Sequence, residues 1–306
     1  MPQQDSIVAV LSLFNPPAEV VDRIRRLQRQ VDNVVVVDDG SPSPDACTFE
    51  QLADIAQVIR LGENKGIGAA LNAGIQQART AWDPAWVLTL DQDSEIGPHF
   101  IERALETAQR AARAGIRVGA VTPETHNGTR IDMLPGKDEF REGFDPMQSG
   151  TLISATALDH VGLLDESLFI DAVDSEYTAR LRQHGYRLIT GDGCDLSHTL
   201  GQARPMKFLG LRVKIAGRGL NVYYHAPFRV YYMARNSIQL TRKYLLGQPA
   251  WIFKRVALET IFHLIRVTYG PNRMALLKAI VLGTRDGLRG RQGRIPQEVQ
   301  DKLTTL

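Results

Sequence analysis

Continuous apolar runs alternating with amphipathic segments dominate the first hundred residues and restrict the fold most. Residues 7–13, 33–37 and 86–90 are apolar runs of the kind that form strands buried on both faces of a parallel sheet. Helical spacing of apolar residues separates them, at 19–30, 49–56 and 66–79. This alternation with short connections predicts right-handed crossovers and an α/β fold, a Rossmann-like, mainly parallel sheet flanked by helices.

The same alternation continues to about residue 200. Strands are predicted at 57–61, 118–122, 149–155 and 186–190, and helices beginning near residues 103 and 157 and spanning 171–184. The polar, glycine-containing stretch 124–145 predicts either a mobile loop or a short hairpin. Beyond Gly201 the pattern changes to three long helical segments, 229–246, 250–269 and 273–288. We therefore expect an α/β domain over residues 1–200 and a basic, largely helical region over 201–306 that packs on it.

Each of the first four strands is followed by a polar cluster. The clusters are Asn15, Asp38-Asp39-Gly40-Ser41, Glu63-Asn64-Lys65-Gly66 and Asp91-Gln92-Asp93. A single cluster of this kind is ordinary turn chemistry. Four of them on parallel strands meet at the carboxyl edge of the sheet, where open α/β sheets bind ligands. Together they predict a ligand site.

Asp91 and Asp93 are spaced to act on one ligand. In an extended segment, side chains at i and i+2 point the same way. Two carboxylates placed like this suit Mg²⁺ or Mn²⁺ that also binds phosphate oxygens. The pattern alone is weak, because a solvated turn has the same residues.

Nearby residues have groups suited to a nucleotide. Asn15 and Asp39 offer amide and acceptor groups that can hydrogen-bond a nucleobase. Gly66 and Gly68 open a predicted helix, where a ligand can approach the main chain and the helix N-terminus. The segment is neither a dinucleotide-binding fingerprint nor a Walker A loop, so a metal is expected to meet most of the phosphate charge.

Composition indicates an ordinary globular protein of 306 residues, with 43% hydrophobic and 23% charged residues. Cys47 and Cys194 are too few for a disulfide framework and have no zinc-type partners. The start of the chain lacks the features of a signal peptide, and no uncharged segment approaches the ~18 residues of a membrane span. We expect a cytoplasmic protein.

Charge is unevenly distributed along the chain. Of its 36 Lys and Arg, 18 lie between Gly201 and Ile295, together with only two of the 34 acids, Glu259 and Asp286. Such asymmetry favours an anionic partner, either a membrane surface or nucleic acid. A broad apolar face at 251–265, interleaved with basic residues, favours peripheral binding to the cytoplasmic face of the inner membrane. The alternative to membrane binding is that this apolar face packs on the core.

The ordered motifs resemble those of inverting family 2 glycosyltransferases with the GT-A fold. The matching segments are Asp38-Asp39-Gly40-Ser41, Asn64-Lys65-Gly66-Ile67-Gly68 with Asn72, Asp91-Gln92-Asp93, Gly150-Thr151, Gly162-Leu163-Leu164-Asp165-Glu166, Asp171-Ala172-Val173-Asp174-Ser175-Glu176-Tyr177 and Arg182-Gln183-His184-Gly185-Tyr186. The segments 197–201 and 225–236 look most like the bacterial rhamnosyltransferase branch. The resemblance covers roughly residues 7 to 240.

The resemblance implies roles for individual residues. Asp39 with Leu13, Phe14 and Asn15 would hold the donor base, and Asp91 the donor ribose. Asp93 would ligate Mg²⁺ or Mn²⁺, with Asp91 and His198 completing the shell. The other implied nucleotide-sugar contacts are Asn64, Lys65, Gly66, Asn72, Gln92, Thr151, His225 and Arg229, of which the last two would meet the diphosphate.

An inverting transferase needs one base for the acceptor hydroxyl. In the family this is the aspartate of a Glu-Asp pair placed before the Gly-Tyr tyrosine, which here falls on Val173-Asp174. Asp174 is therefore the expected base. Because Val173 replaces the glutamate, Asp171 remains the alternative.

The expected function is metal-dependent transfer of a sugar to a polysaccharide or lipid-linked glycan in cell-surface glycan biosynthesis. L-rhamnose from dTDP-L-rhamnose is the expected donor, with a UDP-hexose or UDP-galactofuranose as the alternative. A non-catalytic sugar-nucleotide binder is disfavoured by the intact Asp93 and Asp174. A nucleic-acid-binding protein is disfavoured because the acidic strand ends repel phosphate without a metal.

Overall fold

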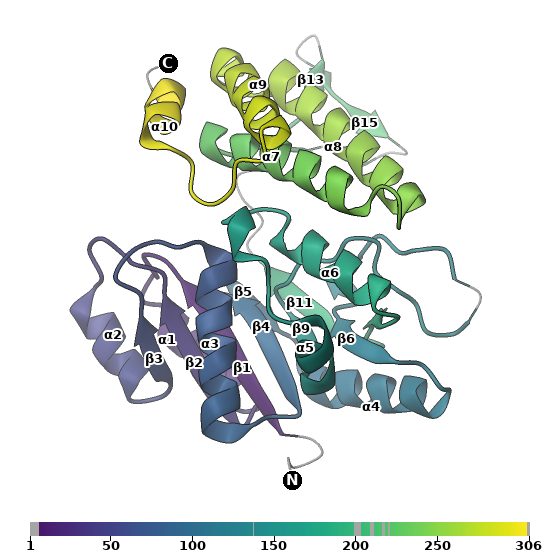
Figure 1. The fold of residues 1–306 in the computed structure, drawn as a ribbon. Helices are drawn as coiled ribbons and strands as arrows, with labels where there is room; N and C mark the ends of the chain where they lie inside the picture. Colours follow the sequence, from purple (N-terminus) through teal and green to yellow (C-terminus); the bar gives the residue numbers. More distant parts are fainter. Residues whose placement is uncertain are drawn as a thin grey trace. The chain divides into compact units, whose positions relative to one another are not determined.

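The computed structural model of the chain describes residues 6–136, 138–198, 203–208, 211–215, 218–219 and 221–304. The chain divides into two compact units. The first consists of Met1–Phe169 and Val173–Thr199, and the second of Ile170–Ala172 and Leu200–Leu306. The boundary expected at residues 200–201 lies outside the described residues. Figure 1 shows the helices and strands of both units.

A seven-stranded sheet forms the centre of the first unit, in the order β10-β6-β9-β4-β1-β2-β3. Its strands are β1 (Ile7–Leu13), β2 (Asn33–Asp38), β3 (Gln57–Arg60), β4 (Trp86–Asp91), β6 (Val118–Thr122), β9 (Thr151–Ser154) and β10 (Arg187–Thr190). β1 pairs in parallel with β2 and β4, and only β9 runs antiparallel to its neighbours within this sheet. The mainly parallel α/β architecture predicted from the sequence is confirmed.

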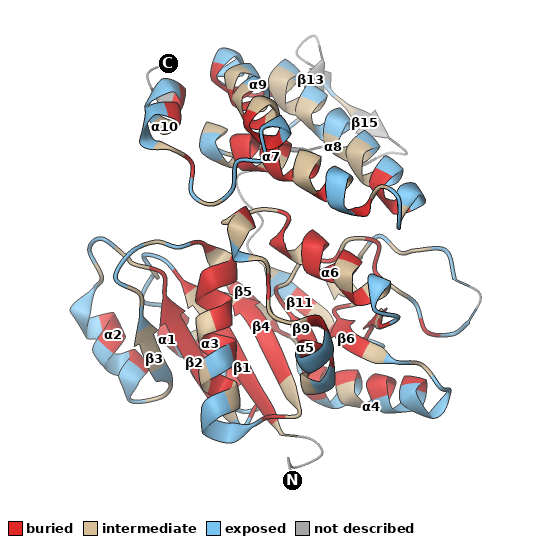
Figure 2. Cartoon of the chain, viewed as in Figure 1, coloured by how far each residue is buried: buried red, intermediate tan, exposed pale blue. Residues whose placement is uncertain are grey.

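Helices cover the sheet on both faces (Figure 1). They are α1 (Val20–Leu27), α2 (Ala46–Ala53), α3 (Ile67–Trp82), α4 (Phe100–Arg113), α5 (Ala155–Val161), the short 3₁₀ helix η1 (Glu166–Leu168) and α6 (Val173–Gln183). The central strands are almost wholly buried (Figure 2). A Cβ atom at Gly74 would lie 2.3 Å from Cγ1 of Val10, so glycine lets α3 pack closely on β1.

A second, four-stranded sheet lies in the same unit, in the order β5-β11-β7-β8. It consists of β5 (Ser94–Ile96), β7 (Thr125–His126), β8 (Thr129–Arg130) and β11 (Asp195–His198). β7 and β8 form a hairpin within the polar stretch 124–145, which confirms the hairpin alternative for that part. The sequence did not indicate β5 or β11, which are too short to show a periodicity.

The predicted start of the helix at residue 171 is wrong. α6 begins at Val173, and Asp171 and Ala172 before it have positive φ angles of 59° and 66°. Phe169 also has a positive φ, 66°. Left-handed geometry is uncommon for residues other than glycine and ends helical hydrogen bonding, so Asp171 lies outside the helix.

The second unit is mainly helical. Its helices are α7 (Pro227–Tyr244), α8 (Pro249–Tyr269), α9 (Arg273–Leu288) and α10 (Gln297–Thr304), preceded by the short strands β12 (Ala203–Pro205), β13 (Lys207–Phe208), β14 (Leu211–Arg212), β15 (Lys214–Ile215), β16 (Arg218–Gly219) and β17 (Asn221–Tyr223). A Cβ at Gly283 would lie 2.3 Å from the carbonyl oxygen of Tyr231, so α7 and α9 pack at close range. The three long helices expected here are present.

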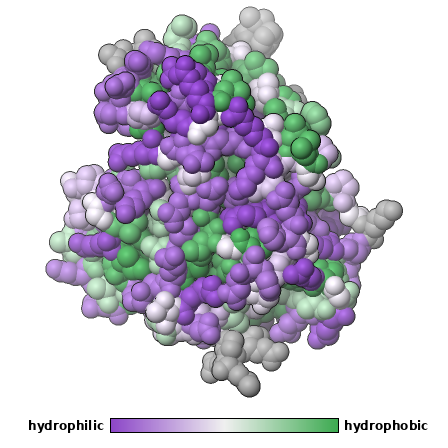
Figure 3. Space-filling model, in the orientation of Figure 1, coloured by the Kyte–Doolittle hydropathy of each residue, from purple (hydrophilic) through white to green (hydrophobic). Residues whose placement is uncertain are grey.

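Large apolar side chains are exposed on α8. They include Phe253, Ile261, Phe262 and Leu264, each at least half exposed. Figure 3 shows apolar surface over this part of the second unit. Among the described residues, no helix is both long and apolar enough to cross a membrane.

Candidate functional site

Polar strand ends converge at the carboxyl edge of the main sheet, as predicted. Leu13 at the end of β1 pairs with Asp38 at the end of β2. Ser12 pairs with Asp91 at the end of β4. Because these strands are parallel and in register, the residues that follow them emerge at one edge.

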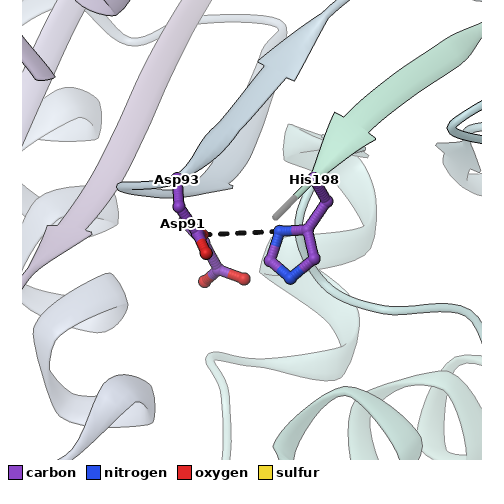
Figure 4. A group of neighbouring side chains, drawn as sticks. All are labelled: Asp91, Asp93 and His198. Atoms are coloured by element: carbon purple, nitrogen blue, oxygen red, sulfur yellow. Dashed lines mark ion pairs between the residues drawn. The ribbon is translucent and has the colours of Figure 1, made fainter. Parts of the chain in front are cut away.

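Asp91, Asp93 and His198 form a compact group at this edge (Figure 4). One ligand atom from each residue lies within 4.8 Å of the others, and His198 Nδ1 is 3.4 Å from Asp93 Oδ1. Asp91 ends β4, Asp93 follows in the turn, and His198 ends β11, which pairs with β5. The two carboxylates suit Mg²⁺ or Mn²⁺, and the imidazole favours Mn²⁺ of these two because nitrogen ligands suit transition metals.

Residues that the sequence did not indicate hold this group in place. Ser94 Oγ is 2.8 Å from His198 Nδ1 and accepts a hydrogen bond from Ser149 Oγ at 2.7 Å. Ser149 Oγ in turn accepts from the main-chain N–H of Asp91 at 3.0 Å, and Gln148 Nε2 donates to Asp91 Oδ1 at 2.5 Å. Such supporting bonds fix the orientation of metal-binding side chains. Ser94 and Ser149 border predicted motifs, but their sequence context gave no sign of this role.

Gln92 joins the ends of β1 and β4. Its Oε1 accepts from the main-chain N–H of Phe14 at 2.9 Å, and its Nε2 donates to the Phe14 carbonyl at 3.3 Å. Asn15, with a positive φ of 48°, donates from its main chain to Ser41 Oγ at 2.8 Å. These bonds bring the segment after Leu13 together with the Asp-x-Asp turn.

Asp39 anchors the loop that leads into α3. The residue is 4% exposed, and its two carboxylate oxygens accept from the main-chain N–H groups of Lys65 (2.7 Å) and Gly66 (3.0 Å). Asn64 Oδ1 in this loop is buried and has no hydrogen-bond partner within the described part of the chain. An orphaned acceptor is costly unless a ligand or water meets it.

Gly66 has no tolerable substitute in this conformation. Its φ is 93°, and a Cβ there would lie 2.3 Å from the carbonyl oxygen of Phe169. The same carbonyl accepts from the N–H of Ile67 at 2.9 Å. The start of α3 is therefore fixed against the turn that follows η1.

Asn72 and Thr151 are bonded to the protein itself. Asn72 is 2% exposed and its amide bonds to the main chain of Leu164 and to Glu166 Oε1. Thr151 Oγ1 donates to the Met147 carbonyl at 3.0 Å. Both residues shape the site in this structure, and direct contact with a donor stays a prediction for them.

Asp174 is the second residue of α6. Its Oδ1 accepts from the main-chain N–H of Ser175 at 2.8 Å, and Ser175 Oγ donates to Asp145 Oδ2 at 2.9 Å. Glu176, 1% exposed, forms a salt bridge of 2.8 Å with Arg180. Glu176 is therefore structural, and the role of Asp174 as the base stays a prediction.

Asp171, His225 and Arg229 belong to the second unit, whereas the other predicted site residues lie in the first. Arg229 forms a salt bridge of 2.7 Å with Asp171. Burial, together with the nearby guanidiniums of Arg229 and Arg266, lowers the pKa of His225 to about 4. Residues 199–201 of the predicted motif lie outside the described residues.

Comparison with known proteins identifies the family. Residues 9–165 match the model of the family described as "Glycosyl transferase family 2". The chain belongs to this family. It is also 31% identical over 307 residues to the dTDP-rhamnosyl transferase RfbF of Shigella flexneri, covering 94% of this chain and 97% of that protein. This member of family 2 is thus a glycosyltransferase.

A second relative matches only in part. The succinoglycan biosynthesis protein ExoO of Rhizobium meliloti (strain 1021) is 30% identical over 132 residues, which are 42% of this chain and 36% of ExoO. The chain therefore spans about a third of that relative's length, and the match adds only to the family assignment.

Solved structures agree on the fold. TarS of S. aureus superposes with a TM-score of 0.58 at 14% identity over 97% of this chain, which spans half the length of that TarS chain. TarS 1–349 in complex with UDP-GlcNAc gives a TM-score of 0.55 over 83% of its length. At this identity the likeness shows the fold alone, and it confirms the GT-A architecture of this family 2 enzyme.

Proposed function

We propose that this enzyme transfers L-rhamnose from dTDP-L-rhamnose, with inversion, to a polysaccharide or lipid-linked glycan of the cell surface. The observation that carries the donor is the likeness to a dTDP-rhamnosyl transferase, which extends over 94% of the chain. The carboxylates and imidazole of Asp91, Asp93 and His198 support a metal-dependent reaction.

The carboxyl edge of the sheet would hold the nucleotide. Leu13, Phe14 and Asn15 lie at the end of β1 beside Asp39, the proposed contact of the base. The bonds of Asp39 to Lys65 and Gly66 orient the loop that leads into α3. The orphaned Oδ1 of Asn64 is available to a donor hydroxyl or amide. Asp91 would bind the ribose, and Gln148 fixes the orientation of its carboxylate.

Asp93, Asp91 and His198 would hold Mg²⁺ or Mn²⁺ against the donor diphosphate. When bound, the cation supplies Lewis-acid stabilisation of the charge that develops on the leaving nucleotide. His225 and Arg229 of the second unit remain proposed partners of the diphosphate.

Asp174 would accept the proton of the acceptor hydroxyl as that oxygen attacks the anomeric carbon. The acid lies in the first turn of α6. Asp171 is a poorer candidate because its carboxylate is paired with Arg229 at 2.7 Å.

Donor turnover tests the proposal. Purified enzyme is incubated with dTDP-L-rhamnose, UDP-glucose or UDP-galactofuranose, with Mn²⁺ or with EDTA, and nucleotide release is measured with a short glycan acceptor. We expect release from dTDP-L-rhamnose only with the metal. Faster release from either UDP-sugar would refute the rhamnose assignment. Binding of donor without release under any condition would show a non-catalytic binder.

The basic second unit is proposed to contact an anionic membrane leaflet, which would suit a lipid-linked acceptor and a peripheral, cytoplasmic location. Those of its 18 basic residues between Gly201 and Ile295 that are exposed can contribute ~1 kcal/mol each near such a surface. The exposed apolar residues of α8 add a face that can enter the headgroup region. Equal co-sedimentation with anionic and neutral vesicles at low salt would rule this out.

A further inference from the structure

A pocket of about 280 Å³ lies within the second unit, where the start of α7, the end of α8 and the start of α9 meet. Its walls include His225 and Pro227 at the start of α7, Arg266 near the end of α8, and Asn272 at the start of α9. We call it the helix-end pocket. Of these residues, only His225 was expected to be functional.

Arg266 is a partly buried cation that Glu259 and Asp171 attract from beyond salt-bridge distance. Its Nη1 lies 3.3 Å from Nδ1 of His263, and no carboxylate of the described residues lies within salt-bridge distance of its guanidinium. Glu259, the acid of the same helix, pairs instead with Arg255 at 3.1 Å and lies 3.6 Å from His263. Burial lowers the pKa of Arg266. A buried guanidinium without a paired anion is costly, and an anion in the pocket would offset that cost.

Two helix N-termini border the same pocket. α7 and α9 are 18 and 16 residues long, and neither has a side-chain hydrogen bond at its N-cap, Ala226 or Asn272. The first N–H groups of a helix have no partner within the helix, and its N-terminus carries a partial positive charge. At α7, however, Pro227 has no N–H and the N–H of Arg229 donates to the Ala226 carbonyl at 2.9 Å, so most of the N–H groups come from the start of α9.

At the C-terminal end of α8, two main-chain carbonyl groups accept hydrogen bonds. The carbonyl oxygen of Tyr269 accepts from Tyr224 Oη at 2.9 Å, and that of Arg266 accepts from the N–H of Gly270 at 2.6 Å. These bonds occupy carbonyls that would otherwise repel an anion. The net character of the pocket is therefore positive.

We propose that the helix-end pocket binds a phosphate or diphosphate group. The guanidinium of Arg266 can bond two oxygens of one phosphate, while N–H groups at the start of α9 and the imidazole of His225 meet the others. The assignment does not rest on the donor sugar or on metal at Asp93. Two sources share this chemistry: the diphosphate of a nucleotide, and the phosphate of a lipid headgroup.

Inorganic pyrophosphate is the probe. The full-length protein is melted in EDTA at low ionic strength with pyrophosphate, phosphate or chloride at equal ionic strength. We expect pyrophosphate to raise Tm of the wild type, because an anion that binds the folded state stabilises it. In Arg266→Gln the affinity should fall about tenfold or more, since one charge-assisted contact is lost. The matched control is Lys254→Gln, which removes an exposed charge from the same helix.

Asn272→Asp keeps the test valid if Arg266→Gln folds poorly. Aspartate is nearly isosteric with asparagine, tolerates the left-handed φ of 57° and is a good N-cap, yet it places negative charge at the pocket. We expect a folded protein that no longer binds pyrophosphate. A wild type that pyrophosphate does not stabilise, or an Asn272→Asp variant that binds it equally well, overturns the proposal.

Two further arms identify the source. Competition with pyrophosphate by dTDP in EDTA, lost in Asn272→Asp, assigns the pocket to a nucleotide diphosphate. Binding to vesicles containing phosphatidic acid, but not phosphatidylcholine alone, lost in the same variant, assigns it to a lipid phosphate. If pyrophosphate binds and neither source does, the pocket holds an adventitious ion only and the proposal fails. Failure of dTDP-L-rhamnose turnover leaves the pyrophosphate result unchanged, so the two proposals are separable.

Discussion

The side-chain amide of Asn236 donates a hydrogen bond of 2.8 Å to the main-chain carbonyl of Asp171, and a second of 2.9 Å to that of Ile170. Asn236 is fully buried, and Arg235 Nε donates to its Oδ1 at 2.9 Å, which orients the amide. Asp171 and Ala172 have left-handed main chains, a conformation that costs of order 1–3 kcal/mol for such residues. α7 thus holds a strained turn that leads directly into the helix of Asp174.

Asn236→Asp should therefore reduce both stability and turnover. The variant keeps the volume of the side chain but loses both donated bonds, which leaves two carbonyls unsatisfied at about 1–3 kcal/mol each. Urea denaturation and steady-state kinetics measure the two effects, and we expect kcat to fall more than KM rises. The control is Gln239→Ala on the same helix, α7. It removes a surface hydrogen bond from the Gln239 amide to the Arg291 carbonyl. An unchanged kcat in the folded variant would show that the turn does not position Asp174.

Asp174→Asn and Asp171→Asn decide which acid is the base. Removing the base should lower kcat by about 10²–10⁴ while donor binding persists, because a positioned base contributes a factor of this size. We expect that result for Asp174→Asn. Asp171→Asn should instead weaken the pair with Arg229 and reduce stability modestly. The reverse pattern in single-turnover rates would assign the base to Asp171.

Asp93→Asn should abolish the stimulation of turnover by Mn²⁺. The substitution removes a charged ligand from the group it forms with Asp91 and His198. Asp91→Asn should mainly raise the donor KM, because its proposed role is at the ribose. Metal titrations of activity compare both variants with Asp54→Asn, an exposed aspartate at the end of α2. Equal Mn²⁺ dependence in Asp93→Asn and the wild type would contradict the metal site.

Gly66→Ala should destabilise the enzyme by about 1–3 kcal/mol, the usual cost of forcing extra volume into a packed position. Its positive φ adds strain, and the new methyl group would meet the Phe169 carbonyl at 2.3 Å. Gly62→Ala in the same loop is the control, because a Cβ there meets nothing within 4 Å. Urea denaturation of both variants measures the difference. A Gly66→Ala protein as stable as Gly62→Ala would refute the close contact.

Acidification should destabilise the second unit through His225. Burial and the neighbouring Arg229, Arg266 and His263 lower its pKa from 6.5 to about 4. Between these values the unfolded chain binds more protons than the folded one, so the free energy of unfolding falls as pH falls through this window. Urea denaturation at about pH 7.5 and about pH 4.5 should show a smaller loss for His225→Gln than for the wild type. Identical losses would mean that His225 is protonated in the folded state.

The sheet and its polar edge were predictable because they follow from local patterns. Apolar runs without alternation indicated parallel strands, and parallel strands necessarily bring Asp39, Asp91 and Asp93 to one edge. Ser94 and Ser149, which support His198 and Asp91, were missed because serine beside a strand is ordinary turn chemistry.

The turn before α6 was missed for a different reason. Acids near the start of a helix look the same whether the residue before them is helical or left-handed, so Asp171 was placed in the helix. Nothing in the residue types of Phe169 or Ala172 favours positive φ. The partners that impose this conformation, such as Asn236, lie more than sixty residues away in the chain.

Close packing at the start of α3 has a kinetic consequence. A Cβ at Gly68 would lie 3.5 Å from Cγ1 of Val173, and Gly66 is held against Phe169, so the loop anchored by Asp39 bears directly on the first turn of α6. A nucleotide bound at this loop, as proposed, would therefore also fix the position of the carboxylate one residue beyond Val173. Such an arrangement favours compulsory order, in which the donor enters first and the acceptor meets a base already in position.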